Sequence, residues 1–188
     1  MTKRRAIFLD RDGVINANRA DHVKRWDEFV FLPRSLDALR RIATSEFIVL
    51  VATNQAAIAR GLTTEAAVRD IHARMTVGVG RAGGRIDAVY YCPHHPDENC
   101  DCRKPRLGLY RQGAREWNLD LTRSYVVGDA MADIVAAQGI GATPLLVLTG
   151  RGNEQHAALR ENNHAGYHVV DDLMSAVEWI WRKENLAP

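Results

Sequence analysis

The sequence predicts an α/β protein with a doubly wound, mostly parallel sheet and helices on both faces. Short apolar runs alternate with amphipathic segments along the chain, which is typical of a parallel sheet covered on both sides. The 188 residues are 46% hydrophobic and 26% charged, ordinary values for a globular protein, so a single packed core is feasible. No repeat or long linker interrupts the pattern, and we expect one domain over residues 1–188.

Six short apolar runs are the predicted strands. The first, Ala-Ile-Phe-Leu, is followed at once by charged residues, as expected where a buried strand ends. In chain order we place the strands at Ala6–Leu9, Phe47–Ala52, Ala88–Tyr91, Tyr125–Val127, Leu145–Leu148 and His168–Val170.

Six amphipathic segments between these runs are the predicted helices. Thr64 followed by Glu65 is a plausible helix start, and the apolar residues between Leu173 and Ile180 fit one helical face. The glycine-rich stretch 78–85 lacks the context of a phosphate loop and is predicted to end a helix. We place the helices at Ser35–Thr44, Thr64–Val79, Leu109–Trp117, Met131–Gln138, Glu154–Glu161 and Leu173–Lys183.

The charge pattern bears on the partners and location to expect. The formal net charge of +2 argues neither for nor against a nucleic-acid partner, but no dense basic run is present, and we expect no such partner. No apolar stretch approaches the roughly 18 residues of a membrane span. The basic first residues precede an apolar run too short for a secretion signal. We therefore expect a cytoplasmic protein, and a monomer because no apolar interface stripe stands out.

Two carboxylates follow the first predicted strand. Asp10 and Asp12 flank Arg11 and precede Gly13, at the carboxyl end of a strand, where open α/β sheets place their chemistry. A pair spaced this way suits phosphoryl transfer, in which the first Asp attacks phosphorus and the second moves protons. The same four residues also suit a turn or part of a calcium loop, so other segments must decide.

Polar residues also follow other predicted strands. The hydroxyl of Thr53 and the amides of Asn54 and Gln55 can donate hydrogen bonds to a phosphate. Arg103 and Lys104, beside Pro105, can clamp a phosphoryl group. Alone, the polar residues Thr53–Gln55 are usually a turn or a helix cap. Alone, Arg103 and Lys104 could be a solvated basic pair.

The last such segment follows the strand that is predicted to end at Val127. Asp129 can supply a magnesium carboxylate, and Asp133, one helical turn later, can orient Lys104. Aspartate near a helix start is also common capping chemistry.

All three cysteines fall within eleven residues, beside histidines. Cys92, His94, Cys100 and Cys102 would complete a tetrahedral zinc site with no open position, so the predicted metal is structural. His95 is the alternative imidazole ligand. Free thiols on a loop are the other interpretation, and a disulfide framework is disfavoured by the odd, clustered count.

The chain resembles the haloacid dehalogenase (HAD) superfamily over its whole length, because these polar segments occur in that family's order. Within it, the zinc loop at residues 92–102 resembles the D,D-heptose 1,7-bisphosphate phosphatases and the similar histidinol-phosphate phosphatases. The matching motifs are LDRDGVIN at Leu9–Asn16, ATNQ at Ala52–Gln55, CPHHP at Cys92–Pro96 and CDCRKP at Cys100–Pro105, with VFLP at Val30–Pro33 and IARGL at Ile58–Leu62.

The resemblance implies a role for each matching residue. Asp10 would be the nucleophile and Asp12 the acid/base, with Thr53, Arg103 and Lys104 stabilising the phosphoryl group. Asp10, the Asp12 carbonyl and Asp129 would hold Mg²⁺. The other expected substrate-binding residues are Arg11, Asn18, Asn54 and Gln55.

The implied reaction is magnesium-dependent removal of the C7 phosphate of D-glycero-D-manno-heptose 1,7-bisphosphate, in synthesis of lipopolysaccharide or surface-layer glycans. Too few residues separate the motifs for a cap domain. Ala56, Ala57 and Ala130 depart from the family pattern and bear on substrate preference. The alternatives are a histidinol-phosphate or other small sugar-phosphate phosphatase and, more remotely, a non-catalytic zinc-stabilised module. Asp12 argues against dehalogenation, and the missing cap against a phosphomutase.

Overall fold

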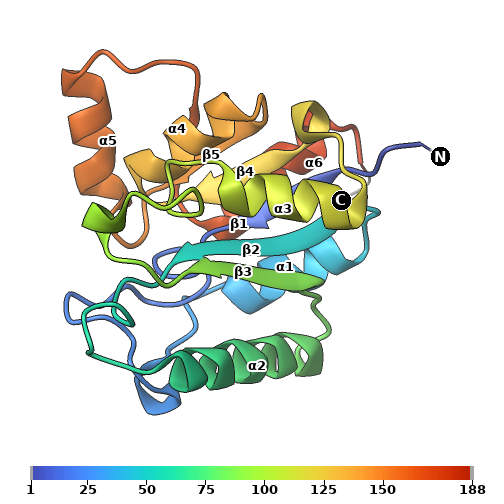
Figure 1. The fold of residues 1–188 in the computed structure, drawn as a ribbon. Helices are drawn as coiled ribbons and strands as arrows, with labels where there is room; N and C mark the ends of the chain where they lie inside the picture. The colour runs from blue at the N-terminus through green and yellow to red at the C-terminus, as the bar shows by residue number, and fades with distance from the viewer. Residues whose placement is uncertain (1, 187–188) are drawn as a thin grey trace.

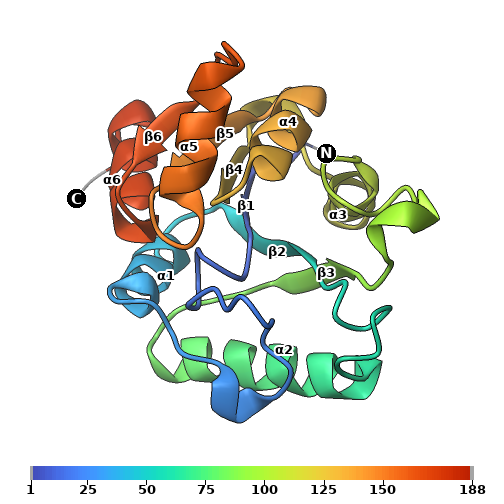
Figure 2. The same cartoon turned by 90° about the vertical axis from the view of Figure 1, so that its left-hand side faces the viewer.

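The computed structural model, which describes residues 2–186, is built around one parallel sheet of six strands (Figures 1 and 2). The strand order is β3-β2-β1-β4-β5-β6, and each neighbouring pair is parallel. The strands are β1 (Ala6–Leu9), β2 (Ile48–Asn54), β3 (Ala88–Cys92), β4 (Tyr125–Gly128), β5 (Thr143–Val147) and β6 (His168–Val170). Residue 1 and residues 187–188 of the predicted domain lie outside the described part.

Helices cover both faces of the sheet, which confirms the predicted fold class (Figure 2). On one face, Ile7 and Leu9 pack with apolar residues of α1 (Ser35–Ala43), α2 (Glu65–Arg81) and α6 (Leu173–Lys183). On the other face, Phe8 and its neighbours pack with α3 (Gly108–Trp117) and α4 (Met131–Gly139), and α5 (Gly152–Glu161) packs beside α4. No helix in residues 2–186 is long and apolar enough to cross a membrane.

The side chains of β1 explain how one short apolar run contributes to the apolar cores on both faces of the sheet. All four of its residues are fully buried, and successive side chains point to opposite faces of a strand. Ile7 and Leu9 therefore enter one core and Ala6 and Phe8 the other. Such a strand is apolar throughout instead of alternating, which is typical of the middle of a parallel sheet.

Several predicted boundaries differ from the structure by one or two residues. β2 continues through Thr53 and Asn54, which were expected after the strand, because β3 pairs with them at Tyr91 and Cys92. β5 begins at Thr143, two residues early, because it pairs with Tyr125 of β4. Three 3-10 helices were not predicted: Trp26–Glu28, Pro96–Glu98 and Leu121–Arg123.

Candidate active site

A cavity of about 350 Å³ lies at the carboxyl ends of the central strands. Parallel strands direct their carboxyl ends to one edge of a sheet, so residues distant in sequence converge there. Eight of the predicted site residues line this cavity: Asp10, Asp12, Asn18, Thr53, Asn54, Arg103, Lys104 and Asp133. The side chains of Arg11, Gln55 and Asp129 are buried beside the cavity and are not part of its lining.

Lys104 joins the acidic residues of the cavity floor. Its Nζ lies 2.6 Å from Asp133 Oδ1 and 3.1 Å from Asp10 Oδ2, and it donates to the Ala52 carbonyl at 2.7 Å. Burial alone would lower the pKa of Lys104, but the charges of Asp10 and Asp133 outweigh it and raise that pKa. Lys104 is therefore a fixed cation, and its predicted contact with Asp133 is present.

Asn54 fixes the backbone of the Arg103-Lys104 segment. Its Oδ1 accepts from Lys104 N at 3.0 Å, and its Nδ2 donates to the Lys104 carbonyl at 3.1 Å. This reciprocal pair attaches the segment after the cysteine cluster to the end of β2. Arg103 lines the cavity, and its buried Nη1 has no partner among the described residues. A buried donor without a partner is costly, so an acceptor bound in the cavity would stabilise it.

The Asp12 carboxylate accepts hydrogen bonds on both oxygens. Arg11 Nη2 donates to Oδ1 and Oδ2 at 3.0 and 2.9 Å, Asn16 Nδ2 donates at 2.9 Å, and Gln55 Nε2 donates at 3.0 Å. Burial would raise the pKa of Asp12, but the Arg11 charge and these hydrogen bonds outweigh it and lower that pKa. Arg11 and Gln55, expected at the substrate, thus orient Asp12 from behind the cavity.

Thr53 presents its hydroxyl to the cavity floor. The side chain is buried, and its Oγ1 accepts a hydrogen bond from Gln55 Nε2 at 3.0 Å. Because a hydroxyl carries one proton as well as acceptor lone pairs, that proton is still available for a bound group.

Three buried carboxylates, from Asp10, Asp129 and Asp133, lie close enough to share an ion, with oxygens within 4.8 Å of one another. Burial, and next the charge of Asp10, raises the pKa of Asp129 to about 7. Lys104 supplies one positive charge against this cluster. Carboxylate oxygens are the ligands that Mg²⁺ prefers, and a divalent cation would offset the remaining negative charge, so the residues fit this ion.

Two glycines allow Asp129 to reach this position. A Cβ on Gly13 would lie 2.1 Å from Asp129 Oδ2, and one on Gly150 would lie 2.3 Å from the same atom. Both glycines also have positive φ, which other residues rarely adopt. The loops after β1 and β5 therefore close around Asp129, whose Oδ2 also accepts from Arg151 N at 2.8 Å.

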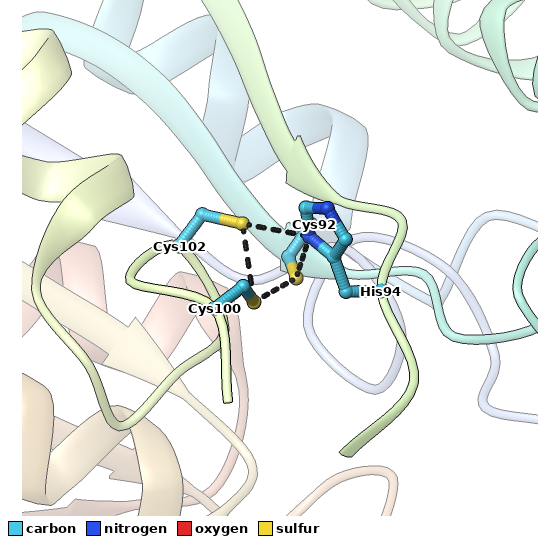
Figure 3. A group of neighbouring side chains, drawn as sticks. All are labelled: Cys92, His94, Cys100 and Cys102. Carbon is cyan, nitrogen blue, oxygen red and sulfur yellow. Dashed lines mark hydrogen bonds between the residues drawn. The ribbon is translucent and has the colours of Figure 1, made fainter. Parts of the chain in front are cut away.

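The four predicted zinc ligands point toward one another (Figure 3). The Sγ atom of Cys100 lies 3.5 Å from those of Cys92 and Cys102, and His94 Nδ1 lies 3.5 Å and 3.2 Å from the same two sulfurs. In a tetrahedron with Zn–S bonds of ~2.3 Å, sulfur atoms are ~3.8 Å apart, so this set fits zinc.

His95, the alternative zinc ligand, is used elsewhere. Its Nδ1 accepts from Asp97 N at 3.4 Å, and Glu98 accepts from His95 N at 2.6 Å, which caps the 3-10 helix Pro96–Glu98. The structure thus favours His94 in the cluster.

Sequence reasoning missed four cationic or titratable residues that line the cavity: Arg19, His22, Arg60 and Arg151. The three arginines, called here the rim arginines, are on loops and their side chains are partly exposed. Arg151 follows β5 just as the predicted residues follow their strands, so the same rule would have found it. Arg19 belongs to the loop near Asn18–Asp21, which the family resemblance predicts to face the substrate, whereas Arg60 lies on an irregular segment that carries no such signal.

The three departures from the family pattern lie at two depths. Ala56 and Ala130 line the cavity, where they leave space and provide no hydrogen-bonding group. Ala57 is fully buried and does not line the cavity.

The site as a whole combines a carboxylate beside a fixed lysine, a second oriented carboxylate, several donors and a place for a divalent cation. This set can transfer a phosphoryl group to Asp10 and then to water.

Comparisons with known proteins agree with this chemistry. A family model described as HAD-hydrolase-like matches residues 101–176. The D-glycero-β-D-manno-heptose-1,7-bisphosphate 7-phosphatase of Bordetella bronchiseptica is 41% identical over 93% of this chain and 96% of its own length. The enzyme of the same name from Pseudomonas aeruginosa is 42% identical over 79% of this chain and 84% of its own.

A solved structure supports the same relationship. The crystal structure of a D,D-heptose 1,7-bisphosphate phosphatase from B. bronchiseptica, complexed with magnesium and phosphate, superposes with a TM-score of 0.89. Its chain is 39% identical, and the match covers 95% of this chain and 99% of that one.

Proposed function

The chain belongs to the family of D-glycero-β-D-manno-heptose-1,7-bisphosphate 7-phosphatases, and on this premise we propose how its residues act. It is a magnesium-dependent HAD phosphatase that removes the C7 phosphate of the heptose bisphosphate. The observation that best supports the proposed residue roles is that Asp10 contacts Lys104, while Asp12 beside it is oriented separately by Arg11.

Asp10 is the proposed nucleophile. Its Oδ1 accepts from Arg11 N at 2.7 Å, and its Oδ2 lies 3.1 Å from Lys104 Nζ. Both carboxylate oxygens are therefore held in place, and the lysine partly balances their negative charge. One of its oxygens forms a bond to phosphorus while the bond to the C7 oxygen breaks. Asp12 gives that oxygen a proton, which it must first take up from solvent because its lowered pKa leaves it ionised in the free protein, and it later takes one from the water that cleaves the aspartyl-phosphate.

The phosphoryl oxygens would be bound by Thr53, Arg103 and Lys104. The free hydroxyl proton of Thr53, the unpartnered Nη1 of Arg103 and the fixed charge of Lys104 all supply donors at the cavity floor. Fixed donors of this kind stabilise negative charge that develops in the transition state. Asp133 holds Lys104 in place at 2.6 Å.

Asp10, Asp129 and the backbone carbonyl of Asp12 are the proposed magnesium ligands. The ion neutralises charge on the transferred phosphoryl group when bound. The three converging carboxylates support this assignment, because Lys104 and the more distant Arg151, 4.0 Å from Asp129, are the cations that balance three negative charges.

The cavity rim favours a second anionic group on the substrate. The rim arginines, Arg19, Arg60 and Arg151, all line the cavity, where Arg19 also pairs with Asp21 and Arg151 lies 4.0 Å from Asp129. Histidinol phosphate would bring a cationic amine to this region, and the two acidic residues that the sequence offers as its partners, Asp21 and Asp97, do not line the cavity. Asp21 pairs with Arg19 and Lys24, and Asp97 is almost fully exposed beside His95.

Zinc at the cysteine cluster would be structural, because four protein ligands leave no open position. The cluster directly precedes Arg103 and Lys104, so the metal would fix the segment that carries both cations. A single domain, a cytoplasmic location and a place in nucleotide-heptose synthesis for lipopolysaccharide or surface-layer glycans belong to the same proposal.

The test is phosphate release, with and without magnesium, from both anomers of heptose 1,7-bisphosphate and from histidinol phosphate. We expect kcat/KM for one heptose anomer to exceed that for histidinol phosphate by at least about a hundredfold, which is ~2.7 kcal/mol of transition-state discrimination. Asp10→Asn should abolish turnover of every substrate. Turnover that survives this substitution would refute the nucleophile, and a preference for histidinol phosphate would refute the substrate.

A further inference from the structure

The guanidinium of Arg11 is completely buried between two partners. Its Nη2 donates to both oxygens of Asp12, and its Nη1 lies 3.1 Å from Nε2 of His72, which does not line the cavity. Its Nε has no partner among the described residues. His72 and Asp12 therefore fix the two ends of this planar group.

The contact determines the protonation of His72. Arginine has only donors, so Nε2 of His72 must be the acceptor, and the ring proton of a neutral imidazole must then be on Nδ1. Burial, and next the charge of Arg11, lowers the pKa of His72 to about 3. The ring also packs edge-on against Tyr91 of β3, with ring centroids 5.3 Å apart. His72 is thus a neutral acceptor with a single tautomer.

Losing this acceptor would release one end of the guanidinium. Arg11 Nη1 would join Nε as a second buried donor without a partner, and the group would be free to turn toward another acceptor. Turning breaks the two-point contact of Nη2 with Asp12, because both contacts require one orientation of the plane. Asn16 and Gln55 would then be the remaining donors to that carboxylate.

We propose that His72, a residue of α2 outside the cavity, positions the Asp12 carboxylate through Arg11. This inference rests on the proposed function, in which Asp12 transfers protons. His72 is a positioning residue: it contacts Arg11 and does not line the cavity. It acts on the rate of the chemical steps and leaves substrate binding to the cavity residues.

The test compares His72→Leu, which removes the acceptor, with His72→Gln, which restores one. We expect His72→Leu to lower kcat at least about tenfold at unchanged KM, since general acid–base catalysis contributes roughly 10²–10⁴-fold. His72→Gln should keep kcat within about threefold. Met75→Leu, a buried change one turn along α2, is the control for packing and should leave both constants unchanged.

Wild-type kcat in His72→Leu, or equal loss in the Leu and Gln variants, would overturn the proposal. A second measurement does not depend on activity: the ¹⁵N chemical shifts of the His72 ring should show a bare Nε2 and a protonated Nδ1 at pH 6. The opposite tautomer, or a charged ring, would overturn it as well. A wild-type protein that hydrolyses no phosphate ester would refute the proposed function, yet the tautomer would still report whether the contact exists.

Discussion

At the residue scale, Lys104 makes more contacts within the site than its sequence motif indicates. One ammonium group contacts two carboxylates and a carbonyl, and its backbone is held by Asn54. A buried charge paired this closely is costly to break, because each partner is left charged and desolvated. On the proposed function, both stability and catalysis therefore depend on Lys104 Nζ.

Lys104→Met should destabilise the protein by about 3–5 kcal/mol, because it leaves Asp10 and Asp133 without their cation. It should also lower kcat by at least about a hundredfold through loss of transition-state stabilisation. Urea unfolding and phosphate release measure the two effects. Lys183→Met, on the exposed end of α6, is the matched control, and a stability loss no larger than that of the control would contradict the prediction.

The pKa of His72 predicts a pH dependence of stability. A histidine whose pKa falls from 6.5 to about 3 on folding binds fewer protons in the native state than in the unfolded state between these values. The contribution of neutral His72 to the free energy of unfolding is thus complete above pH 6.5. It is lost as pH falls, by about 2 kcal/mol between pH 7 and pH 5. Arg11 and Asp12 are the charged groups facing it.

Urea unfolding at pH 7 and pH 5 tests this expectation against His72→Gln, which cannot titrate. The wild type should lose about 2 kcal/mol more than the variant over this interval. Equal losses in the two proteins would show that His72 does not have a lowered pKa.

Single residues were predictable wherever a position in a strand determines what lies beside it. Asp10 directly follows β1, Thr53 and Asn54 end β2, and the structure brings all three to one cavity. Arg11 was expected at the substrate because a sequence cannot distinguish a solvated cation from a buried one. Its burial depends on Asp12 and on His72, which lies 61 positions away.

At the element scale, the segment from the end of β3 to Lys104 is the part for which we propose a structural metal. It contains only one turn of 3-10 helix and few large apolar residues, yet it leads directly into Arg103 and Lys104, which line the cavity. A metal that ties its two ends together would supply the rigidity that apolar packing supplies elsewhere.

Removing zinc with a strong chelator should lower the melting temperature by at least about 5 °C and reduce activity even with magnesium in excess. His94→Ala should do the same and reduce the zinc content below one atom per chain, whereas His95→Ala should retain the metal. Metal analysis and calorimetry provide the measurement. An unchanged melting temperature after zinc is demonstrably removed would show that the metal is not structural.

The type of every strand and α-helix was predictable from periodicity, and the boundaries less so. β1, β6 and α6 match the predicted ranges because apolar runs and polar residues coincide with their ends. β2 runs on through Thr53 and Asn54 because hydrogen bonds to β3 extend it, which no local pattern reports. The 3-10 helices were missed because three residues are too few to show a period.

At the scale of the whole molecule, the sheet is enclosed by helices on both faces (Figure 1). Its edge strands, β3 and β6, have five and three residues. The large exposed apolar residues among those described, Val30, Leu62, Val77 and Val169, belong to four different segments. Short edges offer little surface for pairing with another chain.

We therefore expect a monomer of 21.0 kDa in solution. Sedimentation velocity over a hundredfold range of protein concentration measures this directly. A single species at the monomer mass is the expected result, and a stable dimer at micromolar concentration would contradict it.

The residues of the cavity floor are joined by ion pairs, whereas the rim arginines lie on loops. This difference constrains how such a chain can evolve. Asp10, Lys104 and Asp133 depend on one another by direct contact, so the loss of any one impairs the others and selection must retain them together. Arg19 and Arg60 stand on irregular loops and take no part in these contacts, so the exchange of either leaves the floor contacts in place. A lineage can therefore drift toward a new phosphate ester by single substitutions on the rim while its reaction stays the same.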